Sequence, residues 1–275
     1  MPYMQTGKYI ENRILPDVIR AICLRKDILL EAFSEDWVIR LTKDNSSAWI
    51  YGYHFDLNSG AANEIANDKV ATYLVLDAAG VPAIAHYLLR SEAREPIVAS
   101  KIIQRIPDVD NPFVIKPLSG SSGKYLHYAS NLVAGLEITR SSGESAWAAS
   151  PHEDIVKEFR VVTLDKEPEL IYEKTNPVVV NDLKLFNLGL GARAVNISQE
   201  NSTRERLSEL ASAASHALHL RVAAVDIVQL ADGQLKVLEI NSGISFEHYG
   251  RQSQQNHKKA EQIYDKIIDR IFTND

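Results

Sequence analysis

The sequence predicts an α+β fold, because strands that can pair as antiparallel hairpins alternate with separate amphipathic helices. The clearest hairpin lies in residues 222–243, where two apolar runs flank Asp232-Gly233, a dipeptide suited to a two-residue turn. A second pair of strands is predicted at 155–164 and 171–174. Apolar residues at helical spacing predict the helices that lie before and after these strands.

The composition is that of a soluble globular protein. The chain has 275 residues, 45% of them hydrophobic and 24% charged, and a net charge of −6. This acidic balance gives no indication of nucleic acid or a membrane as a partner. No apolar run approaches the roughly 18 residues of a membrane span, and the N-terminus has no signal-peptide pattern. Cys23 is the only cysteine, so we expect no internal disulfide and a cytoplasmic location.

The first part of the chain predicts a short βα piece. Its expected elements are a helix, two short strands and a longer helix, at residues 15–24, 37–41, 48–55 and 61–79. The longer helix should stop at Gly80, because a glycine followed shortly by a proline is a common C-terminal stop. Asp68 and Lys69 would then lie in the middle of that helix.

Lys116 and the loop after it indicate a phosphate site. The strand 113–117 places this lysine among apolar residues, where its charge is costly unless it meets an anion. The loop that follows can turn backbone N–H groups toward phosphate oxygens, and it consists of Ser119, Gly120, Ser121, Ser122 and Gly123. It is not a Walker A loop, since Leu118 stands where that pattern needs glycine. A flexible hairpin with a snorkelling lysine is the alternative. A strand at 83–89 and a helix around 101–105 are expected before the strand 113–117.

Arg160 lies inside the apolar strand 155–164. Its parity with Val162 and Leu164 places it on a buried face, where a guanidinium needs a partner. One interpretation is an ion pair with a carboxylate on the next strand, such as Glu173. The other is that Arg160 points into a cleft and binds a phosphate group during its transfer.

Three further segments complete the chain. Residues 181–193 are interrupted by glycine and lack periodicity, which predicts a loop over a site or a surface excursion. Ser202 to Glu205 reads as a capping box, with a helix after it that leads to the hairpin. Residues 258–271 predict a closing amphipathic helix.

The hairpin carries a candidate metal site. With Asp232-Gly233 at the turn, Ala231 pairs with Gln234 and Asp226 lies opposite Glu239. Asn241 shares the face of Glu239, because side chains alternate along a strand. Two opposed carboxylates among apolar residues should repel each other, and a hard cation such as Mg²⁺ would remove the conflict. The alternative is the polar face of an exposed hairpin.

Taken in order, these residues resemble the ATP-grasp superfamily between residues 67 and 245. The similarity is greatest to its peptide-forming branch, which includes a glutamate ligase that modifies a ribosomal protein, and glutathione synthetase more distantly. The most specific part is the pairing of Asp226 with the Glu-Ile-Asn run at 239–241. The resemblance implies two α+β lobes that clamp ATP. It also implies residue roles: Lys69, Lys116, the loop 119–123 and Asn187 for ATP phosphates, Arg160 and Lys116 for catalysis, and Asp226, Glu239 and Asn241 for Mg²⁺ or Mn²⁺.

The same resemblance implies three parts: a truncated N-terminal domain at 1–82, a small lobe at 83–152 and a large lobe at 153–275. The strand that links the lobes, Ala148 to Ser150, lacks the acidic residue that many relatives use for the adenine amine or ribose. GTP therefore stays open as an alternative to ATP. Because the truncated domain leaves a wall of the substrate site missing, which a second subunit could supply, we favour a homodimer.

The function that the resemblance implies is ATP-dependent ligation of a small carboxylic acid to an amine, such as an amino acid or peptide, through an acyl phosphate. Two alternatives are a small-molecule kinase on the same fold and a nucleotide-binding protein without turnover. Zinc hydrolysis and serine-esterase chemistry have no support, since no HExxH, CxxC or GxSxG motif occurs.

Overall fold

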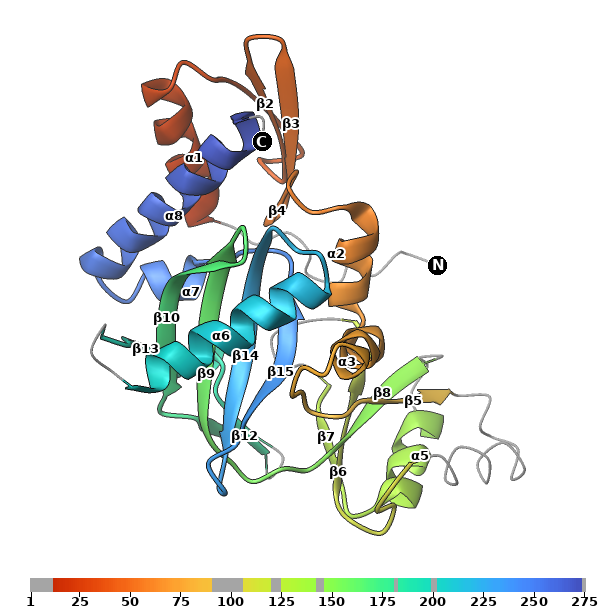
Figure 1. The fold of residues 1–275 in the computed structure, drawn as a ribbon. Helices are drawn as coiled ribbons and strands as arrows, with labels where there is room; N and C mark the ends of the chain where they lie inside the picture. The colour runs from red at the N-terminus through yellow and green to blue at the C-terminus, as the bar shows by residue number, and fades with distance from the viewer. Residues whose placement is uncertain are drawn as a thin grey trace. The chain divides into compact units, whose positions relative to one another are not determined.

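The computed structural model of the chain describes residues 12–90, 106–119, 125–141, 146–180, 183–198 and 202–273. Their contacts form two units (Figure 1). The terminal unit contains residues 12–58 and 243–273, and the central unit contains residues 59–242. The fold is mixed α+β, as the sequence predicts. Within the described residues, no helix is long and apolar enough to cross a membrane. The helix expected around 101–105 lies outside this part of the chain.

The terminal unit is built from both ends of the chain around a sheet of order β1-β2-β3-β4. The helices expected at 15–24 and 258–271 are confirmed, and so are the strands at 37–41 and 48–55, the latter divided by Gly52 with φ 62°. Strand β1 was not expected. The elements are α1 (Ile14–Arg25), β1 (Leu29–Phe33), β2 (Val38–Lys43), β3 (Ser46–Tyr51), β4 (His54–Phe55), α7 (Glu247–Gly250) and α8 (Gln254–Phe272).

The centre of the central unit is a five-stranded sheet with order β13-β10-β9-β14-β15. Helix α6 (Ser202–Ala217) covers one face of it (Figure 1), and Leu207 and Ala211 of the helix share a buried core with Val225 and Ile227. The helix begins at Ser202 itself, so the expected capping role of Ser202 is one position off. The strands are β9 (Ile155–Leu164), β10 (Glu167–Thr175), β13 (Arg193–Asn196), β14 (Val222–Leu230) and β15 (Leu235–Asn241). The predicted pairing of 155–164 with 171–174 is confirmed.

The hairpin β14-β15 reaches the expected register by an unexpected route. Asp226 lies opposite Glu239 and Ala224 opposite Asn241, as predicted. The two-residue turn is wrong: Leu230 N donates to Gln234 O (2.9 Å), which leaves a three-residue loop with Gly233 at φ 84°. The pairing then shifts by one residue between Asp226 and Ile227, a β-bulge that cancels the change at the turn.

The single helix expected at 61–79 is two helices, α2 (Gly60–Asn67) and α3 (Lys69–Ala78). Asp68 separates them with extended backbone angles, φ −105° and ψ 113°. Its carboxylate accepts hydrogen bonds from Val70 N (2.9 Å) and Ala71 N (3.0 Å), which caps α3. Lys69 therefore opens a helix instead of lying in the middle of one, while the stop at Gly80 holds.

A four-stranded sheet of order β5-β8-β6-β7, with helix α5 packed against it, is the second large sheet of the central unit. The strand expected at 83–89 is shorter, because only Tyr87 to Arg90 pair in this sheet. Ala148 to Ser150 are buried in β8, between β5 and β6. The elements are β5 (Tyr87–Arg90), β6 (Phe113–Pro117), β7 (His127–Ala129), α5 (Leu132–Ser141) and β8 (Ala146–Pro151).

The segment around 181–193, expected to be a loop, carries regular structure where it is described. Strands β11 (Val178–Val180) and β12 (Leu183–Leu185) pair as a small antiparallel hairpin. A 3-10 turn, η2 (Leu188–Leu190), follows and leads into β13. The glycines that suggested a loop belong to this turn, where Gly191 has φ 118°.

Glu247 ties the two ends of the chain together within the terminal unit. Its side chain is 3% exposed and accepts hydrogen bonds from Ile14 N (2.7 Å) and Leu15 N (3.3 Å) at the start of α1. These are backbone donors that have no partner inside the helix. Arg251 also contacts the carboxylate, at 3.1 Å. A buried carboxylate from near the C-terminus thus caps the first helix.

We expect Glu247→Ala to lower the free energy of unfolding by about 1–3 kcal/mol, because two buried N–H groups would lose their acceptor. Urea unfolding followed by circular dichroism would measure the change. Glu261→Ala is the matched control, since Glu261 lies on α8 with its side chain 43% exposed. Equal midpoints for the two variants would contradict the capping role.

Candidate functional site

Charged side chains cross the central sheet in one continuous row. Pairing places Tyr172 beside Arg160, Arg160 beside Asp226, and Asp226 beside Glu239, on four adjacent strands. Because side chains alternate, this row lies on the face turned away from α6, which we call the polar face. Glu158 and Lys174, two residues from Arg160 and Tyr172 in their strands, share it.

Asp226 is the centre of this row and is 1% exposed. Arg160 donates to both of its oxygens, from Nε to Oδ1 at 2.7 Å and from Nη2 to Oδ2 at 2.6 Å. Lys174 Nζ lies 2.9 Å from Oδ1 and also forms an ion pair with Glu158. Two acids and two bases thus balance one another in the sheet interior. Glu173, the alternative partner considered for Arg160, pairs with Lys157 because it points to the opposite face.

These contacts control the protonation of the cluster. Burial favours the neutral acid, but Arg160 and Lys174 outweigh it and hold the pKa of Asp226 below its usual value. Burial also disfavours the guanidinium charge, yet Asp226 raises the pKa of Arg160 well above its ordinary value. Burial raises the pKa of Glu158, an effect that Lys174 only partly offsets. Asp226 and Arg160 are therefore a fixed pair of charges.

Glu239 and Asn241 fit a hard cation. Both lie on β15 and share the polar face, and Asn241 Nδ2 donates to Glu239 Oε1 at 3.2 Å. This orientation leaves the amide oxygen of Asn241 and further lone pairs of Glu239 as donors of the kind that Mg²⁺ binds. Asp226 lies next to them, but Arg160 and Lys174 already compensate its charge. The predicted repulsion is thus relieved by side chains. No cluster of three or more His, Cys, Asp or Glu residues suited to a metal occurs among the described residues.

Two lysines approach Glu239 from other elements of the central unit. Lys116 on β6 is 7% exposed, and burial lowers its pKa to about 8, an effect that Glu239 opposes and Lys69 reinforces. Burial also lowers the pKa of Lys69, at the start of α3, although Glu239 raises it. Lys69 Nζ donates to Leu118 O (3.4 Å). One buried and one half-buried ammonium group therefore act electrostatically on Glu239.

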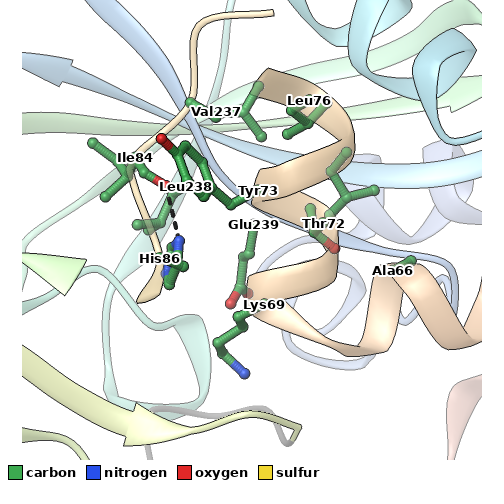
Figure 2. A pocket seen from close by; sticks show the side chains of 12 residues that line it. Ala66, Lys69, Thr72, Tyr73, Leu76, Ile84, His86, Val237, Leu238 and Glu239 are labelled. Carbon is green, nitrogen blue, oxygen red and sulfur yellow. Dashed lines mark hydrogen bonds between the residues drawn. The ribbon is translucent and has the colours of Figure 1, made fainter. Parts of the chain in front are cut away.

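A small cavity of about 10 Å³ adjoins Lys69 and Glu239 (Figure 2). It lies between α3, residues 83–86 and β15, and can hold roughly one water molecule. His86, 2% exposed, lines it with Nδ1 against Ile84 O (2.8 Å). Its Nε2 has no hydrogen-bond partner among the described residues. Burial, and Lys116 next, keep the pKa of His86 well below its usual value, so the ring is neutral.

The remaining predicted residues either lie outside the described part of the chain or have a local role there. Ser119 ends a described stretch, and Gly120, Ser121, Ser122 and Gly123 lie outside the described residues. The side chain of Asn187 accepts a hydrogen bond from Gly189 N (2.7 Å) and begins η2, which is a local role. A phosphate contact for these residues stays a prediction.

The structure adds Lys174, Glu158 and His86, which the sequence did not single out. Parity could have placed Glu158 with Arg160, and Lys174 with Tyr172. Joining the two sets required the register between β9 and β10, which is irregular between Pro168 and Leu170. His86 had no signal beyond its place in an apolar run.

No protein-family model and no curated protein matches the chain. Solved structures do match. ATP-grasp ligase PsnB, complexed with a minimal precursor, is 15% identical with a TM-score of 0.52, over 76% of this chain and 64% of PsnB. The D-alanine–D-alanine ligase of Bacillus anthracis is 19% identical with a TM-score of 0.57, over 78% of this chain and 68% of that one.

D-cycloserine synthetase DcsG is 18% identical with a TM-score of 0.53, over 74% of this chain and 71% of that one. PsnB also matches in a complex with Mg and ADP, and the Bacillus anthracis ligase in a complex with ATP. The chain spans slightly less than two thirds of PsnB. At these identities the likeness is one of fold, and the fold of this chain is the ATP-grasp fold.

Proposed function

We propose that this chain is an ADP-forming ATP-dependent ligase that joins a small carboxylic acid to an amine through an acyl phosphate. The observation that carries the proposal is that Lys69 lines one small cavity with Glu239, while the buried Lys116 also acts on Glu239 electrostatically, beside the row that holds Arg160. Cations that are partly or wholly removed from water favour a bound polyanion. The ligases among the matched structures support the general class of reaction.

ATP and Mg²⁺ are the ligands that the site residues fit best. Lys69 and Lys116 would contact the phosphates, with Ser119 to Gly123 and Asn187 as further predicted contacts. Glu239 and Asn241 would hold Mg²⁺, or Mn²⁺ in its place, next to Asp226. The ion would supply positive charge to the phosphates during transfer. GTP stays an alternative, since Ala148 and Ala149 in β8 offer no side-chain hydrogen bond for a base.

The chain's residues then serve two steps. A carboxylate oxygen of the acid attacks the γ-phosphorus, and the bond to the β-phosphate oxygen breaks to release ADP. Lys116 and Arg160 stabilise the negative charge that spreads over the transferred group. The amine next attacks the acyl carbon, phosphate leaves, and the nitrogen loses a proton to give the amide. Exclusion of water protects the acyl phosphate between the steps.

The substrates are proposed only by class. An amino acid or peptide is the favoured partner in both roles, in keeping with the D-alanine ligase and the PsnB precursor complex. The three-part division at residues 82 and 152, a homodimer that completes the substrate site, and a cytoplasmic location belong to the same proposal.

Trapping of the intermediate tests the reaction class. Given ATP, Mg²⁺, hydroxylamine and a panel of amino acids and dipeptides, the protein should yield a hydroxamate with its acid substrate, because hydroxylamine intercepts an acyl phosphate. Mass spectrometry would identify the product. Formation of ADP with a stable phosphorylated alcohol, and no hydroxamate or amide, would replace the ligase with a kinase. No ADP with any substrate would favour nucleotide binding without turnover.

We expect Lys116→Met to weaken ATP binding by about 1.5–3 kcal/mol while adenosine binding changes little, because the lysine meets phosphate and not the base. Titration calorimetry measures both ligands. Lys236→Met is the control, since Lys236 also lies on a strand of the central unit but pairs with Glu153 (3.4 Å). Equal ATP affinity in all three proteins would refute the phosphate contact.

The lowered pKa of Lys116 predicts a pH dependence. Its ammonium is charged below about 8 and loses its proton above that value, whereas bound phosphate favours the charged form. ATP affinity should therefore fall as pH rises from 8 to 9.5, by up to about tenfold per pH unit. Binding at pH 9 should take up a proton, visible by calorimetry in buffers of different ionisation enthalpy. Lys116→Met should abolish this uptake, and uptake that persists in the variant would assign it elsewhere.

A further inference from the structure

We propose that Asp226 is a positioning residue, which fixes Arg160 and Lys174 on the polar face, and that the metal is bound by Glu239 and Asn241 without a bond to Asp226. This inference rests on the proposed function and assigns separate roles to the residues of the site. It differs from the sequence-based expectation, in which Asp226, Glu239 and Asn241 act together as ligands.

The contacts of Asp226 leave little room for an ion. A carboxylate has about four lone-pair positions. Three of them are taken by Arg160 Nε (2.7 Å), Arg160 Nη2 (2.6 Å) and Lys174 Nζ (2.9 Å). The fourth belongs to Oδ2, which already accepts from Arg160 Nη2. A divalent ion there would lie beside the guanidinium, and two cations that share one oxygen repel strongly in a buried setting.

Charge balance gives the same result. Asp226 and Glu158 offset Arg160 and Lys174, so this cluster of four is neutral before any metal is added. If the Asp226 carboxylate compensated a metal ion instead, the charges of Arg160 and Lys174 would exceed that of Glu158 in the sheet interior. Such an uncompensated buried charge is costly.

Glu239 is placed differently, although it faces Asp226 across the hairpin. Its Oε1 accepts a hydrogen bond from Asn241 Nδ2, at 3.2 Å. The lysines that influence it, Lys69 and Lys116, approach from α3 and β6 rather than from the sheet itself. Glu239 therefore keeps oxygen lone pairs for a metal, and Asn241 adds its amide oxygen.

The role of Asp226 follows from which nitrogens it uses. It takes Nε and one terminal nitrogen of Arg160, while Tyr172, beside Arg160 on β10, also hydrogen-bonds the guanidinium. The Arg160 side chain is 23% exposed, against 2% for that of Asp226. Asp226 thus holds the guanidinium from its buried side and presents its outer edge to the polar face.

Metal affinity separates the two assignments. The probe is Mn²⁺ with ADP, whose binding to the full chain is measured by electron paramagnetic resonance. The test protein is Asp226→Asn combined with Lys174→Met, because removal of one acid and one base keeps the net charge of the buried cluster at zero. Glu239→Gln is the matched control, since it also replaces a carboxylate by an amide. We expect Mn²⁺ affinity to change less than threefold in the double variant and to fall at least tenfold in Glu239→Gln.

A second signal reports the positioning directly. In ¹⁵N spectra, the Arg160 Nε–H, assigned by its loss in Arg160→Lys, should exchange slowly with water in the unaltered protein, with or without Mg²⁺ and ADP. It should lose this protection in the double variant. Loss of the protection on addition of Mg²⁺ and ADP to the unaltered protein, or a tenfold fall of Mn²⁺ affinity in the double variant, would overturn the inference. Failure of the unaltered protein to bind Mn²⁺ and ADP would instead refute the proposed function, and with it this assignment.

Discussion

The buried carboxylate of Asp226 is the constraint on which the central sheet depends. Its bonds to Arg160 and Lys174 join three adjacent strands around a carboxylate that is almost fully buried. Such a cluster is stable only if every charge is matched, so strand register and charge pairing must be correct together. A slip of one residue in β14 would turn Asp226 toward α6 and place Val225 or Ile227 against Arg160. The cluster therefore stabilises one register, because a register shifted by one residue would leave buried charges unmatched.

This coupling explains why the sequence predicted the register of the hairpin but not its path. Asp226 opposite Glu239 followed from a two-residue turn, which the structure replaces with a three-residue loop and a bulge. Both routes bring the same residues together, because the second irregularity undoes the first. The extra residue on β15, Leu238, is apolar like Val237 before it, so alternation gave no signal for it. Because both forms place Asp226 opposite Glu239, that pairing does not distinguish them, and the local turn preference contains no information on the bulge.

The limits of prediction elsewhere have the same origin. The strands and helices with strong periodicity were found, and so was the placement of Asp226 opposite Glu239. The break between α2 and α3 was missed, because Asp68 is tolerated inside a helix and its capping bonds become visible only in three dimensions. Lys174 and Glu158 were missed because a charge that is buried by pairing looks, in the sequence, like a charge on a solvated strand. Long-range register decides between these two environments.

The charges of the site also bear on how its ligands would bind together. Four positive charges come from Lys69, Lys116, Arg160 and Lys174, and four negative ones from Asp68, Glu158, Asp226 and Glu239. The described residues are therefore balanced before any ligand binds, and burial, rather than an excess of charge, lowers the pKa of Lys116 and Lys69. A nucleoside triphosphate brings several negative charges at once. A divalent cation beside Glu239 and Asn241 would restore balance, so phosphate and metal would stabilise each other's binding. This balance favours the pair of ligands over either ligand alone.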